Sequence, residues 1–169
     1  NNMSVSGAKS FAAHVGNLSC LENLDLSRNK LSDDACIVIT EAFHKMRSIQ
    51  RLHLDDNNMS VSGAKSFAAY VGHLVYLEDL DLSSNKLSDD GVILITEAFH
   101  KMKSVRHLDL SDNDISDRGG TVLMTEISFL TNLHEIDLSD NKLTDAVAQL
   151  VVDTVKGIGR LWYVDLSYN

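Results

Sequence analysis

The chain has 169 residues, of which 44% are hydrophobic and 23% are charged, and its formal net charge is −9. It contains no proline and two cysteines, which excludes proline-rich linkers, collagen-like chains and disulfide-stapled small domains. The acidic balance argues against a nucleic-acid or anionic-membrane partner, because both need a basic surface, and no apolar run approaches the roughly 20 residues of a membrane span. We therefore expect a soluble, acidic chain with no membrane span.

The pattern L-x-x-L-x-L-x-x-N-x-L recurs every 28 residues. Its copies run over 21–31, 49–59, 77–87, 105–115 and 133–143, with a truncated copy at 161–169. A longer period of 56 residues is superimposed, since residues 57–112 repeat residues 1–56 with 41 identities. Periods of this length are typical of solenoids, and the longer one indicates duplication of a two-repeat unit.

Each copy contains a predicted short strand. In Leu24-Asp25-Leu26-Ser27 hydrophobic and polar residues alternate, as they do in a strand with one buried face. Just past the strand, the amide of Asn29 is placed to satisfy backbone groups of the turn. The equivalent segments predict strands near 23–26, 51–54, 79–82, 107–110, 135–138 and 163–166.

A helix is predicted after each strand. Ser32, followed by Asp33 and Asp34, suits a helix start, where a hydroxyl caps free amides and acids meet the positive end of the dipole. The residues that follow form one helical stripe: Ala35, Val38, Ile39, Ala42, Phe43 and Met46. One such unit cannot bury its own apolar face, so we expect residues 1–169 to stack as six repeats, with strands on the concave side and helices on the convex side.

These repeats resemble leucine-rich repeat proteins. Their 28-residue length and full helices are similar to the ribonuclease-inhibitor-like subfamily, which includes the repeat regions of animal NOD-like receptors and proteins made only of such repeats. Ribonuclease inhibitor often has Cys where this chain has Asn, which favours the receptor-like branch. The resemblance implies an α/β fold, a curved solenoid, and says little about activity because the family shares a scaffold.

In-phase stacking predicts columns of side chains across the sheet. The central column reads Asp25, His53, Asp81, Asp109, Asp137 and Asp165. Stacked carboxylates there should have raised proton affinities, although Leu-Asp-Leu-Ser is also a common scaffold sequence in the family. The preceding column reads Asn23, Arg51, Asp79, His107, Glu135 and Tyr163. Its alternating charges suggest cross-strand pairs that stabilise the sheet, and we expect His53 to pair with a carboxylate.

The duplicated units differ mainly at positions between the first Leu and the Asn of each repeat. Six of ten such positions differ, against nine of the remaining 46. Over the whole chain these positions hold 13 acidic residues and three basic ones, Arg28, Arg51 and Arg106. We predict that this face binds a basic protein or a cationic or microbial ligand.

The last repeat has aromatic residues where earlier copies are polar. Trp162, Tyr163 and Tyr168 take concave or flanking positions, and such residues often anchor interfaces. The alternative is that they pack on a further repeat. The final strand is predicted to be an open edge, through which copies could associate.

No sequence motif of catalysis is present. The chain has no phosphate-binding loop, nucleophile elbow or zinc spacing, so we expect no enzyme activity, no cofactor and no metal. Asp25, His53 and Asp81 form a near-collinear row, which suits a tetrahedral ion poorly.

The two cysteines, Cys20 and Cys36, are expected to be free thiols. Since cysteine-clamped caps are missing, a cytoplasmic location is favoured, and the sequons at Asn2, Asn17 and Asn58 leave an extracellular one open.

The residues favour a non-enzymatic recognition module, and the resemblance implies innate immune pattern recognition or a protein-interaction scaffold. The alternatives are an inhibitor or regulator of a basic enzyme such as a ribonuclease, or a GTPase-activating leucine-rich repeat protein.

Overall fold

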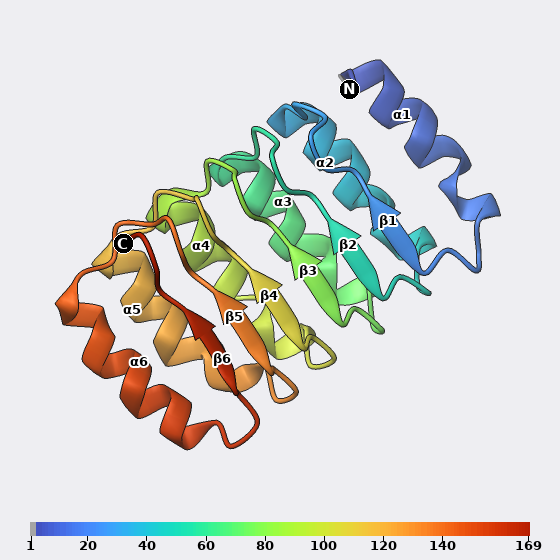
Figure 1. The fold of residues 1–169 in the computed structure, drawn as a ribbon. Coiled ribbons are helices and arrows are strands. Elements are labelled where there is room, and N and C mark those ends of the chain that lie inside the picture. Colours follow the sequence, from blue (N-terminus) through green and yellow to red (C-terminus); the bar gives the residue numbers. More distant parts are fainter. Residues whose placement is uncertain (1–2) are drawn as a thin grey trace.

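The computed structural model describes residues 3–169, so the sequon at Asn2 lies outside the described residues. Helices and strands alternate along the chain (Figure 1). The strands are β1 (Asn23–Asp25), β2 (Arg51–His53), β3 (Asp79–Asp81), β4 (His107–Asp109), β5 (Glu135–Asp137) and β6 (Tyr163–Asp165). The α-helices are α1 (Val5–His14), α2 (Asp33–Glu41), α3 (Val61–Tyr70), α4 (Ser88–Thr96), α5 (Asp117–Glu126) and α6 (Asp145–Gly157).

Short 3₁₀ segments extend most of these helices. The predicted stripe that begins at Ala35 therefore continues past α2 in a tighter turn rather than as one α-helix. The 3₁₀ segments are η1 (Val15–Asn17), η2 (Ala42–Lys45), η3 (Val71–His73), η4 (Phe99–Lys101) and η5 (Ile127–Phe129).

The strands form one parallel sheet in sequence order, from β1 to β6. Neighbouring strands pair residues 28 positions apart, as the repeat period requires. The helices form a second layer on one face of this sheet (Figure 1). The predicted α/β leucine-rich repeat solenoid is confirmed, and we call the sheet surface turned away from the helices the concave face.

The core lies between the two layers. Leu52, Leu80 and Leu108 of the strands are almost fully buried, as are Phe43 and Phe67 of the helical layer. The rings of Phe43 and Phe67 meet edge to face, with centroids 6.0 Å apart. Burial of each such side chain contributes about 1.5–3 kcal/mol to the free energy of folding. The stability of the stack is therefore the sum of many similar contributions, one set from each repeat.

The repeated asparagines connect successive repeats. Asn57 Nδ2 donates to the carbonyls of Leu26 in the preceding repeat and Leu54 in its own, at 3.0 Å each. Its Oδ1 accepts from the amide of Leu31 at 2.9 Å. The amide therefore satisfies turn backbone, as predicted, and it does so across the repeat boundary. The same bonds to carbonyls recur at Asn85, Asn113 and Asn141.

The acidic residues at the helix starts have a further role. Ser32 caps α2 as predicted, accepting from Ala35 N at 3.4 Å. Asp33, however, reaches into the next repeat and accepts from Ser60 N at 2.8 Å and from Gly63 N at 3.1 Å. Each such carboxylate stabilises the start of the following helix. Asp89 and Asp117 make equivalent bonds.

Cys20 and Cys36 are both free thiols, in agreement with the sequence. Cys20 is exposed, whereas Cys36 lies within α2, where burial raises the pKa of its thiol to about 12. Cys36 therefore behaves as a small core residue at neutral pH.

Candidate binding face

The parallel register aligns the predicted side-chain columns on the concave face. Asp25 pairs with His53, which pairs with Asp81, and the column continues to Asp165 on β6. The preceding column likewise runs from Asn23 to Tyr163. Leucine, isoleucine or valine between the columns faces the helices, so the chain's alternation places these polar groups on one surface.

The aspartates of the central column are tied to the backbone. Asp25 Oδ1 accepts from Ser27 N at 2.9 Å and from Ser27 Oγ at 2.6 Å. This local turn explains why Asp and Ser occur together two residues apart, and it gives the column a scaffold role. Equivalent bonds occur at Asp81, Asp109, Asp137 and Asp165.

The prediction of raised proton affinity along the whole column is wrong at both ends. Hydrogen bonds from Ser27 hold the pKa of Asp25 below its usual value, and bonds from Ser167 do the same for Asp165. The expected rise in pKa is found at Asp109, in the middle of the column. Burial, followed by the charges of Asp81 and Asp137, raises the pKa of Asp109 despite its own serine bonds.

Of the cross-strand pairs that the mixed-charge column suggests, one is present within the column, and a second pair joins it to the central column. His107 Nε2 lies 3.8 Å from Glu135 Oε1 on the adjacent strand, as predicted. His53 pairs diagonally, its Nε2 lying 3.7 Å from Asp79 Oδ2. These side chains are about one third to one half exposed, so each pair contributes at most about 1 kcal/mol.

Two shallow hollows indent the concave face. One, of about 280 Å³, spans β2 to β6 and brings together eight of the predicted site residues: His53, Asp79, Asp81, His107, Asp109, Glu135, Asp137 and Tyr163. The second, of about 290 Å³, lies toward the residues that precede the strands. It brings together Arg51, Asp79, Arg106, His107 and Trp162.

Three predicted residues lie outside both hollows. Asp25 is on the first strand, Asp165 on the last, and Tyr168 in the turn after it. Residues that the sequence reading did not select also line the second hollow, from the position just before each strand. They are Gln50, Glu78 and His134, and they occupy the first variable position of the L-x-x-L motif, as Trp162 does in the last repeat.

The aromatic residues of the last repeat are exposed. Trp162 is 69% exposed, Tyr163 is 43% exposed and Tyr168 is 82% exposed. The rings of Trp162 and Tyr163 lie with centroids 6.4 Å apart, and Tyr163 Oη donates to Asp165 Oδ2 at 3.0 Å. Tyr168 has a φ of 57°, a left-handed conformation that a tyrosine rarely adopts.

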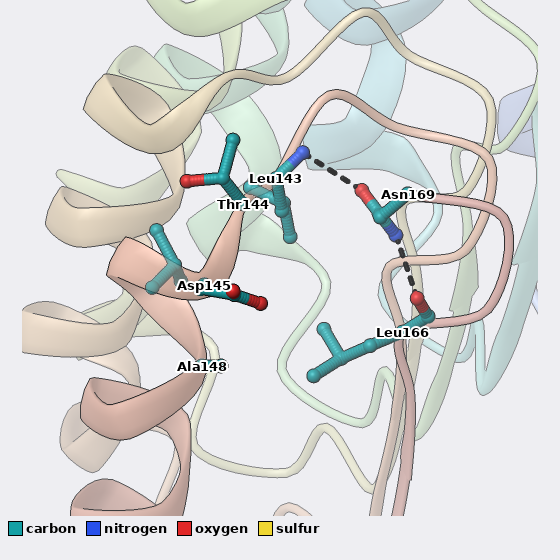
Figure 2. A pocket seen from close by; sticks show the side chains of 7 residues that line it. Leu143, Thr144, Asp145, Ala148, Leu166 and Asn169 are labelled. Carbon is teal, nitrogen blue, oxygen red and sulfur yellow. Dashed lines mark hydrogen bonds between the residues drawn. The ribbon is translucent and has the colours of Figure 1, made fainter.

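A larger hollow, of about 660 Å³, lies at the end of the stack between α6 and the turn after β6 (Figure 2). Within it, Asn169 Oδ1 accepts from Leu143 N and Nδ2 donates to the carbonyl of Leu166. In the preceding repeat the residues equivalent to Leu143 and Leu166 are fully buried by the next repeat. This hollow therefore lies at the end of the described stack, between α6 and the turn after β6, and is not part of the concave face.

The fold and this face define a class: a solenoid of short repeats that presents a parallel sheet as its exposed surface. A sequence profile described as Leucine Rich repeat matches five segments, which together make up more than half of the chain: 17–39, 45–68, 73–95, 101–124 and 129–147. The chain belongs to the leucine-rich repeat family. Such repeats are protein-interaction modules and are generally not enzymes.

Similar proteins support the same assignment. Protein NLRC5 of Mus musculus is 36% identical over 63 residues, which are 37% of this chain and only 3% of that protein. The solved structure of Leiomodin-1 Actin-Binding Site 2 aligns with a TM-score of 0.76 at 14% identity, over 93% of this chain and 89% of that one. The functional domain of InlJ from Listeria monocytogenes aligns with a TM-score of 0.54 at 20% identity, over 91% and 26%. At these identities the two structures show the fold alone.

Within residues 3–169, no helix combines the length and hydrophobicity that crossing a membrane requires.

Proposed function

We propose that this chain is a recognition module that binds a basic protein partner on its concave face. The observation that carries the proposal is the distribution of charge. The variable positions on and beside the strands hold 13 acidic and three basic residues, a net −10, whereas the whole chain has −9. The charges of the remaining residues therefore nearly cancel. In this proposal the electrostatic field of the molecule arises mainly from the concave face.

The serine-bonded aspartates serve both scaffold and recognition in this proposal. In each of them Oδ1 accepts from the turn, and Asp81, Asp109 and Asp137 also line the first hollow. A fixed row of carboxylates needs little reorganisation to meet lysine or arginine side chains. Such a surface steers a basic partner and favours its correct register.

The exposed aromatic residues supply anchors at one end of the face. Trp162 lines the second hollow and Tyr163 lines the first, so both adjoin the acidic columns. Tyr168 is 82% exposed in the turn after β6, beyond both hollows. Its left-handed backbone recurs at the equivalent position of every repeat, so it belongs to the turn and the support for binding is the exposed ring alone.

The likeness to part of Protein NLRC5 supports placing this module in innate immune recognition. The partner's chemistry in this proposal is set by the concave face: lysine- or arginine-rich, and met by carboxylates and aromatic rings.

The experiment is retrieval of partners from the native source by immobilised chain, compared with a Trp162→Ala, Tyr163→Ala double variant. Aromatic anchors often contribute about 2 kcal/mol or more each to binding. The double variant should therefore retrieve less than about a tenth of the amount of partner that the parent chain retrieves. A Tyr76→Ala variant is the matched control, since Tyr76 is equally exposed but lies in a loop outside both hollows. Equal retrieval by the parent and the double variant would refute the proposal.

A further inference from the structure

The second repeat departs from the others at two linked positions on the concave face. In the other five repeats, an aspartate of the central column is followed two residues later by a serine that hydrogen-bonds to it. On β2 these positions are His53 and Asp55. Their counterparts in the duplicated unit, Asp109 and Ser111, keep the ordinary pattern. The second repeat has therefore exchanged the Asp–Ser pair of the other repeats for an imidazole and a carboxylate.

This exchange gathers three potential metal ligands. One side-chain donor atom from each of His53, Asp55 and Asp81 lies within 4.8 Å of the others. It is the one such group of three His, Cys, Asp or Glu side chains found within residues 3–169. The row expected to suit an ion poorly was Asp25, His53 and Asp81. In the structure the third donor is Asp55, which comes from the turn after β2 and replaces Asp25 of β1 in that row.

The surroundings favour a cation at this point. Asp81 Oδ1 is fixed by Ser83 N at 2.9 Å and Ser83 Oγ at 2.7 Å, which leaves its Oδ2 free. Asp55 brings a second carboxylate close to Asp81, and a cation between them would offset the repulsion of the two charges. All three donors are partly exposed, and an entering ion would compete only with the weak 3.7 Å contact between His53 Nε2 and Asp79 Oδ2.

The donor chemistry selects the kind of ion. A mixed set of one imidazole nitrogen and two carboxylate oxygens suits Zn²⁺ and similar transition ions, whereas all-oxygen sets suit Ca²⁺ and Mg²⁺. Tetrahedral ligands about 2.1 Å from zinc lie about 3.4 Å apart, so small rotations of partly exposed side chains would close the present spacing. Three protein ligands would leave a fourth position open toward the concave face.

We propose that His53, Asp55 and Asp81 form a Zn²⁺-binding site on the concave face. The site does not depend on the proposed basic partner, because the ion binds to the chain alone. Elsewhere on the described sheet, as at Asp109 and Asp137, no three such side chains come equally close together, so we propose no zinc site there.

The test is titration of the 169-residue chain with ZnCl₂ alone, monitored by isothermal titration calorimetry. The critical variant carries His53→Asp and Asp55→Ser together. It restores the sequence of the other repeats and leaves the number of carboxylates unchanged, so general attraction of cations to the acidic face is preserved. The parent should bind one equivalent of Zn²⁺, and the variant should bind at least about tenfold more weakly.

A second measurement uses CoCl₂ as a spectroscopic probe. The parent should develop the visible absorption of tetrahedral Co²⁺, and His53→Gln should abolish it while circular dichroism shows an unchanged fold. Two results would overturn the proposal: no saturable Zn²⁺ binding by the parent, or the same affinity in the parent and the charge-matched variant. Retention of the Co²⁺ spectrum by His53→Gln would overturn it as well.

Discussion

At the scale of single residues, two polar side chains carry most of the specificity of the repeat. The asparagine after each strand closes the turn and bonds to the preceding repeat. The aspartate within the strand region is tied to the serine that follows it. Both are recognisable in sequence, but only the structure shows that the asparagine bonds cross the repeat boundary.

Replacing an interior asparagine should be severe. Asn113 is fully buried, and its Nδ2 donates to Leu82 O and Ser111 O at 2.9 Å each. Asn113→Ala leaves buried carbonyls unsatisfied, at about 1–3 kcal/mol each, so we expect a loss of 3 kcal/mol or more in urea unfolding. Asn29→Ala, at a partly exposed turn, is the control and should lose less. Equal losses would show that the buried bonds are unimportant.

The pKa of Asp109 predicts a dependence of stability on pH. Since burial raises that pKa, ionisation of Asp109 is less favourable in the folded chain than in the unfolded one. Asp109→Asn should therefore raise the urea midpoint at pH 7. The gain should shrink as the pH falls through the raised pKa toward about 4, the unfolded value.

Asp25→Asn is the opposite case, because the pKa of Asp25 is lowered. The stability that ionised Asp25 contributes is present above about pH 4 and is lost as the pH falls through its lowered pKa. This variant should lower the midpoint at pH 7 and match the parent in strong acid. If both variants shift the midpoint in the same direction at pH 7, the assignment of the two pKa directions is wrong.

At the scale of elements, the helices depend on carboxylates donated by the preceding repeat. Asp89 of α4 accepts from Ser116 N and Gly119 N at the start of α5. A Cβ on Gly119 would meet Asp89 Oδ1 at 2.6 Å and Val92 Cγ1 at 2.9 Å. The glycine is therefore required by the close approach of two helices, and not by its backbone angles.

Gly119→Ala should destabilise the chain by about 1–3 kcal/mol, because the added methyl group displaces the cap and a packed valine. Thermal unfolding followed by circular dichroism measures the change. Gly157→Ala is the matched control, since nothing lies within 4 Å of its Cβ position, and it should be neutral or stabilising by up to about 1 kcal/mol. Similar behaviour of the two variants would contradict the proposed role of the Asp89 cap.

The elements also show where sequence reasoning stops. The period of 28 residues predicted the strands, their parallel order and the alignment of Asp25 with His53, because each follows from stacking equal units. The change from α2 to a 3₁₀ segment at Ala42 was not predicted, because the spacing of apolar residues over one turn is similar in an α-helix and in a 3₁₀ helix. The zinc ligand Asp55 was not selected either, because its distance from Asp81 depends on how the turn after β2 is oriented.

At the scale of the whole molecule, the proposed function rests on a net charge of −10 at the variable positions of the repeats, against −9 for the whole chain. Binding to the concave face should therefore weaken with salt. A lysine-rich peptide should bind much more weakly at about 1 M salt than at about 0.01 M, as the Debye length falls from about 30 Å to about 3 Å. Affinity measured by fluorescence anisotropy that does not change over this range would contradict an electrostatic mode of recognition.

The most direct measurement compares two variants with the same loss of charge. One carries Asp81→Asn, Asp109→Asn and Asp137→Asn on the concave face, where asparagine can still accept the serine bonds. The other carries Glu41→Gln, Glu97→Gln and Glu126→Gln at the ends of α2, α4 and α5. Affinity for the retrieved partner, measured by calorimetry, should fall at least about tenfold in the first variant and stay unchanged in the second. Equal affinities in the two variants would contradict recognition through the concave face.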